Sequence, residues 1–390
     1  MGATATAVAV LVPSLLPTLQ LGVFGNGPGS GDRDVTLINP ITDLRRDLQR
    51  GADVPLLTLT TDDPSPSYLR IAVLNRFTHN EWSSGNRDIP ADQVPNGEMP
   101  PPPGVNQAVE RTRHRYRVSV TDDFRSTWLP VMSPVTRVVA PGNWRYDAST
   151  MDFIAADEDT TTAGISYDMT GVELDLSQQL LDRAPNPTGS VDPLLTDLPA
   201  DLPSSVSQLA AQVTAGRTTK TSSGRALQRW FRSTGGFTLL RARPDRQRHR
   251  RPGVPRRQDR AGRLHEQFAS AMAVMARTRG IPARVAVGFL TPDQVGPDQW
   301  QYSAWDLHAG RSSTSRRAGW VRFEPTPAGR GTEVPPYTQG AGSPRSRSRA
   351  TSQRPRPATT CRPAGRAPRP TGRTASRARS SAARCTCRGG

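Results

Sequence analysis

The sequence predicts an α+β fold in which a β-rich region precedes a compact core of one helix and three strands. Short β-rich runs between about 52 and 175 are separated by Pro, Gly, Asn and Asp. An amphipathic helix follows at 265–279, and three strand-like runs come after it. One helix followed by three strands makes a compact α+β core, and 390 residues are enough for two domains.

Part of the chain has too few apolar residues to contribute to a core. Hydrophobic residues make up 35% of the chain and aromatic residues 6%, and both fractions are low for a wholly folded protein. The last 50 residues contain no Val, Ile, Leu, Met, Phe, Trp or Tyr. We therefore expect residues 336–390 to form a disordered tail rich in Arg, Pro and Ser.

The formal net charge of +17 comes from two strips of arginine. Residues 341–390 contain 13 Arg and no acid, and residues 241–263 contain 10 Arg and two Asp. Together the strips carry +21, so the rest of the chain carries −4. The strips have no aromatic residue and no Lys, whereas basic binding segments usually mix these types. We predict no nucleic-acid partner. The alternative is that the arginine strips bind DNA or anionic lipid.

Residues 1–30 form an apolar segment without a charged side chain. The run "AVAVLVPSLLPTLQLGVF" is interrupted by Pro13 and Pro17, lacks a basic start, and is marginal in length for a full span. We expect it to be the end of a transmembrane helix leading out of the membrane; a buried N-terminal segment is the alternative. The cysteines, Cys361, Cys385 and Cys387, form neither a disulfide framework nor a zinc knuckle.

Residues 31–175 are predicted to form a sandwich-like β domain. Its strand candidates are "PLLTLTT", "YLRIAVLNRF", "HRYRVSVTD", "TRVVAPG" and "MDFIAA", and "VPNGEMPPPPGVNQ" is expected to be a surface loop. Trp82, Trp128 and Trp144 are candidate core anchors. Nothing in this region suggests chemistry, so we expect a structural or docking role.

A linker at 176–203 and a helical core at 204–335 are predicted next. A helix is expected from about Ser204 to Ser233, with a break near Gly216. In the helix at 265–279 an apolar face is formed by Phe268, Met272, Met275 and Ala276, and Gly280 with Pro282 prevents continuation. The runs "ARVAVGF", "WQYSAWDLHA" and "GWVRFEPTP" are the three strands.

Three polar residues stand at the ends of these core elements: His265 near the helix start, His308 in "DLHA" and Glu324 in "FEPTP". The stretches "EQFASAMAVMARTRGIPARVAVGFL", "YSAWDLHA" and "GWVRFEPTP" resemble the transglutaminase-like superfamily, and within it the bacterial membrane-anchored branch of the TgpA type. The resemblance implies a papain-like core and a Cys–His–acid site with the nucleophile at position 265, His308 as base and Glu324 orienting it. It implies thiol-dependent acyl transfer or amide hydrolysis on a protein or peptide substrate at the cell envelope, on the extracytoplasmic side, without a cofactor.

The family chemistry follows from elementary electrostatics. A cysteine in the first turn of a helix faces unpaired N–H groups and the positive end of the helix dipole, which favour the thiolate. An imidazole beside it takes the proton, and a carboxylate behind the ring fixes its tautomer. In this chain His265 occupies the cysteine's place, and an imidazole cannot form the stable thioester. We therefore expect no acyl-transferase activity from the chain as written.

Two other interpretations of these residues stay open. His265, Glu266 and His308 could hold zinc, although "HEQFA" lacks the second histidine of H-E-x-x-H. The fold could also serve as a non-catalytic binding or scaffold module.

A third interpretation is that the sequence contains frameshifts. After "DLHA" the family pattern continues with a stretch such as "WPELYFEG", where this chain has "GRSSTSRR". Deleting the first base of TGG CCG GAG CTC TAC TTC GAG GGC gives codons for G-R-S-S-T-S-R, and one inserted base restores the frame. Residues 241–263 and 341–390 have the same out-of-frame character. We hypothesise that the parent gene encodes a Cys–His–acid enzyme and that residues 241–263, 310–317 and 341–390 are frameshift products.

Overall fold

The computed structural model describes residues 54–78, 81–85, 87, 89–184, 192–237, 257–315, 318–327 and 334–339. The apolar segment 1–30 and nearly all of the tail 336–390 lie outside these residues. The described residues all belong to one compact unit, Met1–Pro344. None of the helices described is at once long and apolar enough to traverse a lipid bilayer.

The larger of the two main sheets has seven strands in the order β13-β14-β1-β6-β11-β8-β5. Every neighbouring pair is antiparallel. The strands are β1 (Pro55–Thr61), β5 (Asn96–Glu98), β6 (Arg111–Val120), β8 (Val135–Val139), β11 (Ser166–Leu174), β13 (Asp293–Gln294) and β14 (Gln299–Ser303). Strand β5 lies inside the stretch that the sequence predicted as a loop.

The second sheet has five strands in the order β16-β15-β12-β2-β7, again antiparallel throughout. The strands are β2 (Leu69–Leu74), β7 (Val131–Met132), β12 (Ala283–Phe289), β15 (Leu307–Ser315) and β16 (Gly319–Phe323). Two small hairpins pair β3 (Arg76–Thr78) with β4 (Glu81–Ser83) and β9 (Trp144–Asp147) with β10 (Asp152–Ala155). Regions 31–175 and 204–335 both contribute strands to both main sheets, so backbone hydrogen bonds join them.

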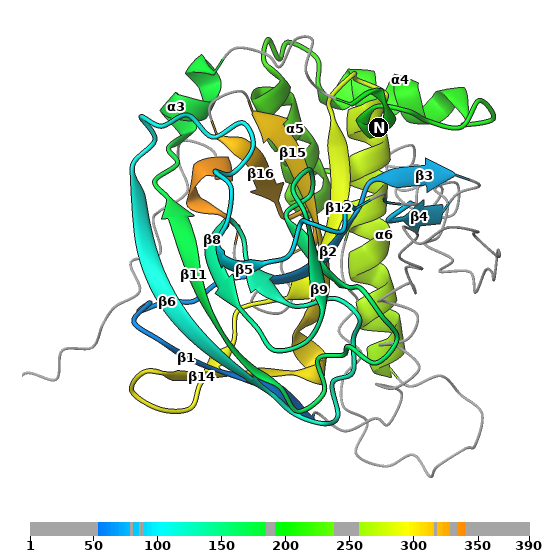
Figure 1. The fold of residues 1–390 in the computed structure, drawn as a ribbon. Helices are drawn as coiled ribbons and strands as arrows, with labels where there is room; N and C mark the ends of the chain where they lie inside the picture. The colour runs from blue at the N-terminus through cyan, green and yellow to red at the C-terminus, as the bar shows by residue number, and fades with distance from the viewer. Residues whose placement is uncertain are drawn as a thin grey trace, which may run out of the picture. The chain divides into compact units, whose positions relative to one another are not determined.

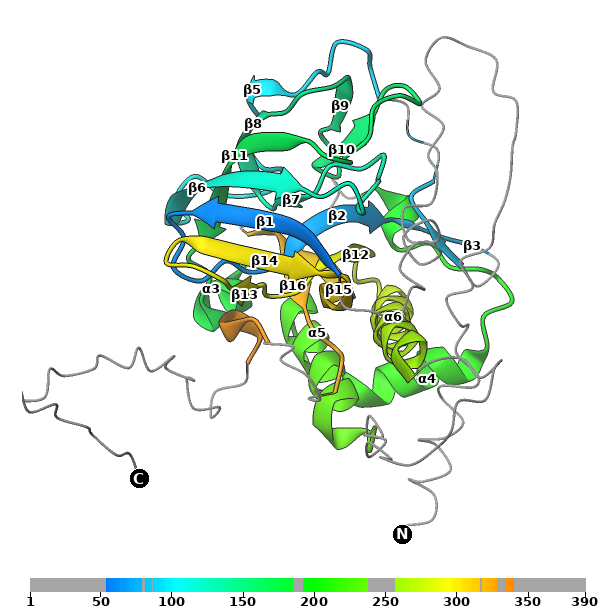
Figure 2. The same cartoon turned by 90° about the horizontal axis from the view of Figure 1, so that it is seen from below.

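The helices gather on one side of the five-stranded sheet (Figure 2). They are α3 (Gln178–Arg183), α4 (Ser204–Val213), α5 (Lys220–Arg229), which continues into the π-helical turn η2 (Trp230–Thr234), and α6 (Arg257–Arg277). Gly216 has a φ of 71° between α4 and α5, which confirms the predicted break. Helix α6 begins at Arg257, eight residues before the predicted start. Helix α3 lies in the stretch predicted as a linker, and its Leu181 is fully buried.

Two hydrophobic cores hold these layers together. The first joins residues of both main sheets and contains Trp128 and Trp144. The second lies between the five-stranded sheet and the helices and contains Trp82, Met272 and Met275. The three tryptophans are at most 1% exposed, which confirms them as core anchors. The α+β fold class is confirmed, and in Figure 1 α6 runs beside β12, where the candidate site begins.

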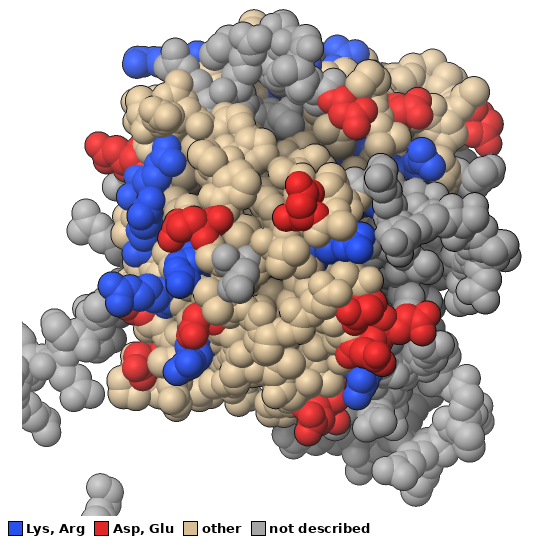
Figure 3. All heavy atoms as spheres, viewed as in Figure 1, with Lys and Arg blue, Asp and Glu red and all other residues tan. Residues whose placement is uncertain are grey.

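Acidic and basic side chains both appear on the face shown in Figure 3. Some exposed charged residues pair across strands, as Arg117 of β6 does with Asp168 of β11 at 3.2 Å. Such exposed pairs contribute little to stability. The mixture matches the small net charge of the chain outside the two arginine strips.

Candidate catalytic site

His308 and Glu324 meet where β15 begins and β16 ends. The two strands are antiparallel, with Arg311 opposite Phe323, so the start of one lies beside the end of the other. His308 Nε2 is 2.7 Å from Glu324 Oε2, and both side chains are fully buried. The structure therefore brings together two of the three residues that the sequence singled out.

The Glu324 carboxylate is held by three groups. Its Oε2 contacts His308 and also accepts a hydrogen bond from Arg322 Nη2 at 3.3 Å, and its Oε1 accepts one from the Thr326 backbone N–H at 3.0 Å. Burial by itself would raise the pKa of Glu324, but His308, Arg322 and Thr326 together hold that pKa well below its ordinary value. The carboxylate is therefore ionised and accepts hydrogen bonds only.

The backbone of Glu324 is fixed by the helical layer. Gln228 of α5 accepts the Glu324 N–H through its Oε1 at 2.8 Å and donates through Nε2 to Thr338. Arg232 donates to the carbonyl oxygens of Glu324 and Thr326, at 3.4 and 2.6 Å. Sequence reasoning missed Gln228 and Arg232, because nothing near them in sequence points to a partner more than 90 residues away.

The backbone of His308 is fixed from the other side. Its register partner on β12 is Gly288, and the Tyr68 hydroxyl donates to the His308 carbonyl oxygen at 3.3 Å. A Cβ at Gly288 would overlap the backbone of Leu69 on β2, so only glycine allows the strands to approach this closely. Arg322 lies over the Tyr68 ring at 4.7 Å and so joins the two supports.

Position 265 lies on α6, whose backbone is described there, whereas the side chains of His265 and Glu266 lie outside the described residues. Because α6 begins at Arg257, position 265 is in the third helical turn and not in the first, as the sequence predicted. The expected help from the helix N-terminus is therefore reduced, since the dipole effect falls off within the first turn.

The level of position 265 along the sheet follows from the connection between α6 and β12. Arg277 at the end of α6 donates from Nε to the carbonyl oxygen of Ala283, at 3.0 Å. The end of the helix and the start of β12 therefore lie at the same level along the sheet. Gly288 lies roughly 16 Å further along β12 at about 3.3 Å per residue. The same distance covers about 11 residues of helix. Position 265 thus lies nearly level with Gly288 and its partner His308.

The predicted alternative of a zinc site is not tested. Among the side chains that the structure describes, no three His, Cys, Asp or Glu form a group that could hold a metal ion. His265 and Glu266, which the alternative needs, are outside that set.

Two protein-family models match the chain. The TgpA N-terminal domain matches residues 1–178, and the transglutaminase-like superfamily matches residues 207–325, which include His265, His308 and Glu324. No curated protein matches significantly.

Two solved structures are similar to this chain. The crystal structure of the periplasmic domain of TgpA from Pseudomonas aeruginosa is 17% identical with a TM-score of 0.48, covering 78% of this chain and 94% of that one. The same domain bound to ethylmercury is 16% identical with a TM-score of 0.47, covering 74% and 96%.

Proposed function

This chain is a transglutaminase-like protein of the TgpA type, and we propose that its parent activity is thiol-dependent acyl transfer or amide hydrolysis on a protein or peptide substrate. The observation that supports this most directly is the buried pair of His308 and ionised Glu324 on adjoining strands. The near-equal level of position 265 on α6 is a second support.

The pair sets the protonation of the imidazole. Because the Glu324 carboxylate only accepts, Nε2 of the neutral ring carries the hydrogen and Nδ1 is the basic nitrogen. With a thiol at position 265, Nδ1 takes the S–H proton and the sulfur attacks the amide carbonyl carbon. The proton then goes to the departing amine, which leaves a thioester. An amine or water cleaves the thioester and regenerates the thiol.

The chain as written has an imidazole at position 265 and hence no sulfur nucleophile. We propose that it is inactive for this reason. We further propose that the domain is extracytoplasmic and tethered by residues 1–30, with its substrate in the cell envelope.

Alkylation of a restored thiol tests the proposal. In a chain whose tail cysteines Cys361, Cys385 and Cys387 are replaced by Ser, His265→Cys is labelled with iodoacetamide across pH. We expect alkylation faster than that of a free thiol, with an apparent thiol pKa below the ordinary value of about 8.5. Adding His308→Asn slows it. Thr278→Cys, just past the other end of α6, is the control and behaves as an ordinary thiol.

The histidine at position 265 favours a second candidate, a non-catalytic scaffold module. The two functions give different results in the same experiment. If the thiol at position 265 never reacts faster than the control thiol, also after residues 310–317 are replaced by "WPELYFEG", the result supports the scaffold and removes the mechanism.

A further inference from the structure

Strand β6 carries a row of arginines on the outer face of the seven-stranded sheet. Every second residue at its start is an exposed arginine, and these residues are Arg111, Arg113, Arg115 and Arg117. Tyr116 and Val118, which alternate with them, are buried in the first core. Residues on one face of a strand repeat every two positions, at about 6.6 Å. The four side chains therefore leave the sheet at regular intervals over a length of about 20 Å.

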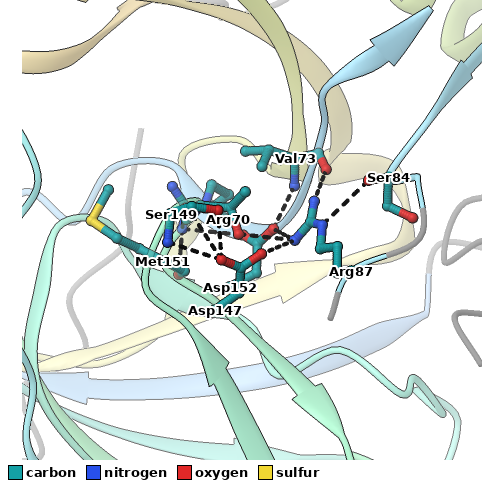
Figure 4. A network of polar contacts seen from close by, with 9 residues as sticks. Arg70, Val73, Ser84, Arg87, Asp147, Ser149, Met151 and Asp152 are labelled. Carbon is teal, nitrogen blue, oxygen red and sulfur yellow. Dashed lines mark hydrogen bonds and ion pairs between the residues drawn. The ribbon is translucent and has the colours of Figure 1, made fainter. Parts of the chain in front are cut away.

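Two arginines of this row have no acidic partner. Inside the fold an arginine can be held by acids, as Figure 4 shows for Arg87, which contacts Asp152 at 2.6 Å and Asp147 at 3.3 Å. In contrast, neither the Arg113 nor the Arg115 side chain forms a hydrogen bond or ion pair with any residue that the structure describes. Their guanidinium groups face solvent with all their donors available to an incoming anion.

A fifth arginine widens the row. Arg137 of β8 and Arg115 of β6 are both directly opposite Thr170 of β11, so the three side chains lie on the same face. Arg137 is thus two strand spacings, or roughly 10 Å, from Arg115. Its acidic neighbour, Glu98, is 3.9 Å away and 76% exposed. Because such an exposed pair is weak, an incoming carboxylate can replace it.

Acids are few around the row. On the outward positions of β6, β8 and β11 the one acid is Asp168, which pairs with Arg117 at 3.2 Å. Asp62, just past β1, accepts the backbone N–H of Arg115 at 2.8 Å and forms no ion pair with its guanidinium. Basic side chains gather on the left of Figure 3, where Figure 1 draws β6 and β11. The chain outside the two arginine strips carries −4, so its overall composition does not account for this basic face.

We propose that this face docks an extended acidic segment of a partner protein that has Asp or Glu at every second position. Such a segment presents its carboxylates at the same interval of about 6.6 Å as the row, so successive carboxylates meet successive guanidinium groups. The backbone of β6 is already paired with β1 and β11, so the contact is made by side chains. A bilayer spreads its charges over a plane, whereas these arginines follow one strand, which favours a linear partner. The inference goes beyond acyl transfer and does not depend on it.

Two fluorescein-labelled peptides of about twelve residues, made of Glu and Thr, test the proposal by fluorescence anisotropy with the full chain. In the first, four glutamates occupy alternate positions, so that all of them can face the row. In the second, the four occupy every third position, so that at most two face the same way. Both peptides have the same composition and charge, so arginines elsewhere, including those of 241–263 and 341–390, attract both equally. We expect the alternating peptide to bind about tenfold more tightly at low salt.

Charge-removing variants locate the binding. Arg113→Gln/Arg115→Gln removes the two unpaired arginines, and the affinities of the two peptides should then differ by no more than about twofold. Arg217→Gln/Arg279→Gln is the control, because it lowers the net charge equally at exposed positions outside the sheets, and it keeps the tenfold preference. All four side chains are exposed, so both variants should melt within about 2 °C of the parent chain.

Two results with the peptides overturn the proposal. One is equal affinity of the parent chain for both peptides, and the other is a tenfold preference that survives Arg113→Gln/Arg115→Gln. Sedimentation with phosphatidylcholine vesicles that contain about one third phosphatidylserine tests a lipid surface as the occupant. Vesicle binding that is lost in this variant but not in the control, together with no preference between the peptides, assigns the face to anionic lipid and also overturns the proposal.

Discussion

Replacing Glu324 by Gln removes one charge and changes almost no volume. The Glu324 carboxylate has three partners. They are the His308 ring at 2.7 Å, the Arg322 guanidinium at 3.3 Å and the Thr326 backbone N–H at 3.0 Å. An amide keeps one acceptor oxygen for Thr326 or His308 but leaves Arg322 without its anion. Breaking a buried charge pair by removing one partner costs about 3–5 kcal/mol, so we expect Glu324→Gln to lose about that much stability at pH 7.

The stabilisation by ionised Glu324 depends on pH, and the direction of its pKa shift says in which direction. The pKa of Glu324 is held below its ordinary value of 4.5 in the folded chain, so its ionised form stabilises the fold above that pH. The contribution is complete at neutral pH and is lost as the pH falls through and below 4.5 toward the folded-state pKa. The stability gap between the parent chain and Glu324→Gln therefore shrinks in acid.

Urea unfolding followed by the fluorescence of the buried tryptophans measures that gap at pH 7, 5 and 3.5. Glu98→Gln is the control, because the Glu98 side chain is 76% exposed and only 3.9 Å from Arg137; it changes stability by less than about 0.5 kcal/mol. Equal losses in the two variants, or a gap that stays constant down to pH 3.5, would refute the buried ion pair.

Two further substitutions test how the site is supported. Gly288→Ala forces β2 and β12 apart, because the new Cβ overlaps the Leu69 backbone. We expect the free energy of unfolding in urea to fall by at least about 2 kcal/mol. Gly296→Ala is the control, since its Cβ meets only the Gln299 side chain, and it costs less than about 1 kcal/mol. Arg277→Met removes the guanidinium donor from the carbonyl of buried Ala283 and from that of partly buried Asn75, and we expect a loss of about 2–4 kcal/mol. Arg279→Met, at an exposed position, is nearly neutral; equal effects would show that the carbonyls find other donors.

The local patterns in the sequence predicted most of the individual elements. The runs at "PLLTLTT", "HRYRVSVTD" and "ARVAVGF" are strands because alternating or continuous apolar residues bury well on a sheet. The break near Gly216 follows from its left-handed backbone conformation. The partners of each strand were not predictable, since pairings such as β1 with β14 join residues more than 200 positions apart. The mixing of regions 31–175 and 204–335 in both sheets depends on such pairings.

The candidate site was predictable where motifs carried it. His308 and Glu324 were found from "DLHA" and "FEPTP", and the geometry now explains their spacing, because the end of one strand returns beside the start of its neighbour. Arg322 could have been found from alternation, since it lies on β16 two residues before Glu324, which directly follows that strand. Gln228, Tyr68 and Gly288 act through contacts that only the folded chain shows.

The backbone of β15 explains how a frame-shifted segment can stay in the fold. A strand pairs through N–H and C=O groups, which every residue other than proline supplies, and β15 as written contains no proline and pairs with both β12 and β16. What a shifted segment loses is the chemistry of its side chains. Resequencing codons 239–265, 310–317 and 340 onward tests the frameshift hypothesis. We expect single-base shifts that change the reading of these segments, and a faultless read retaining all three would leave the inactive relative as the explanation.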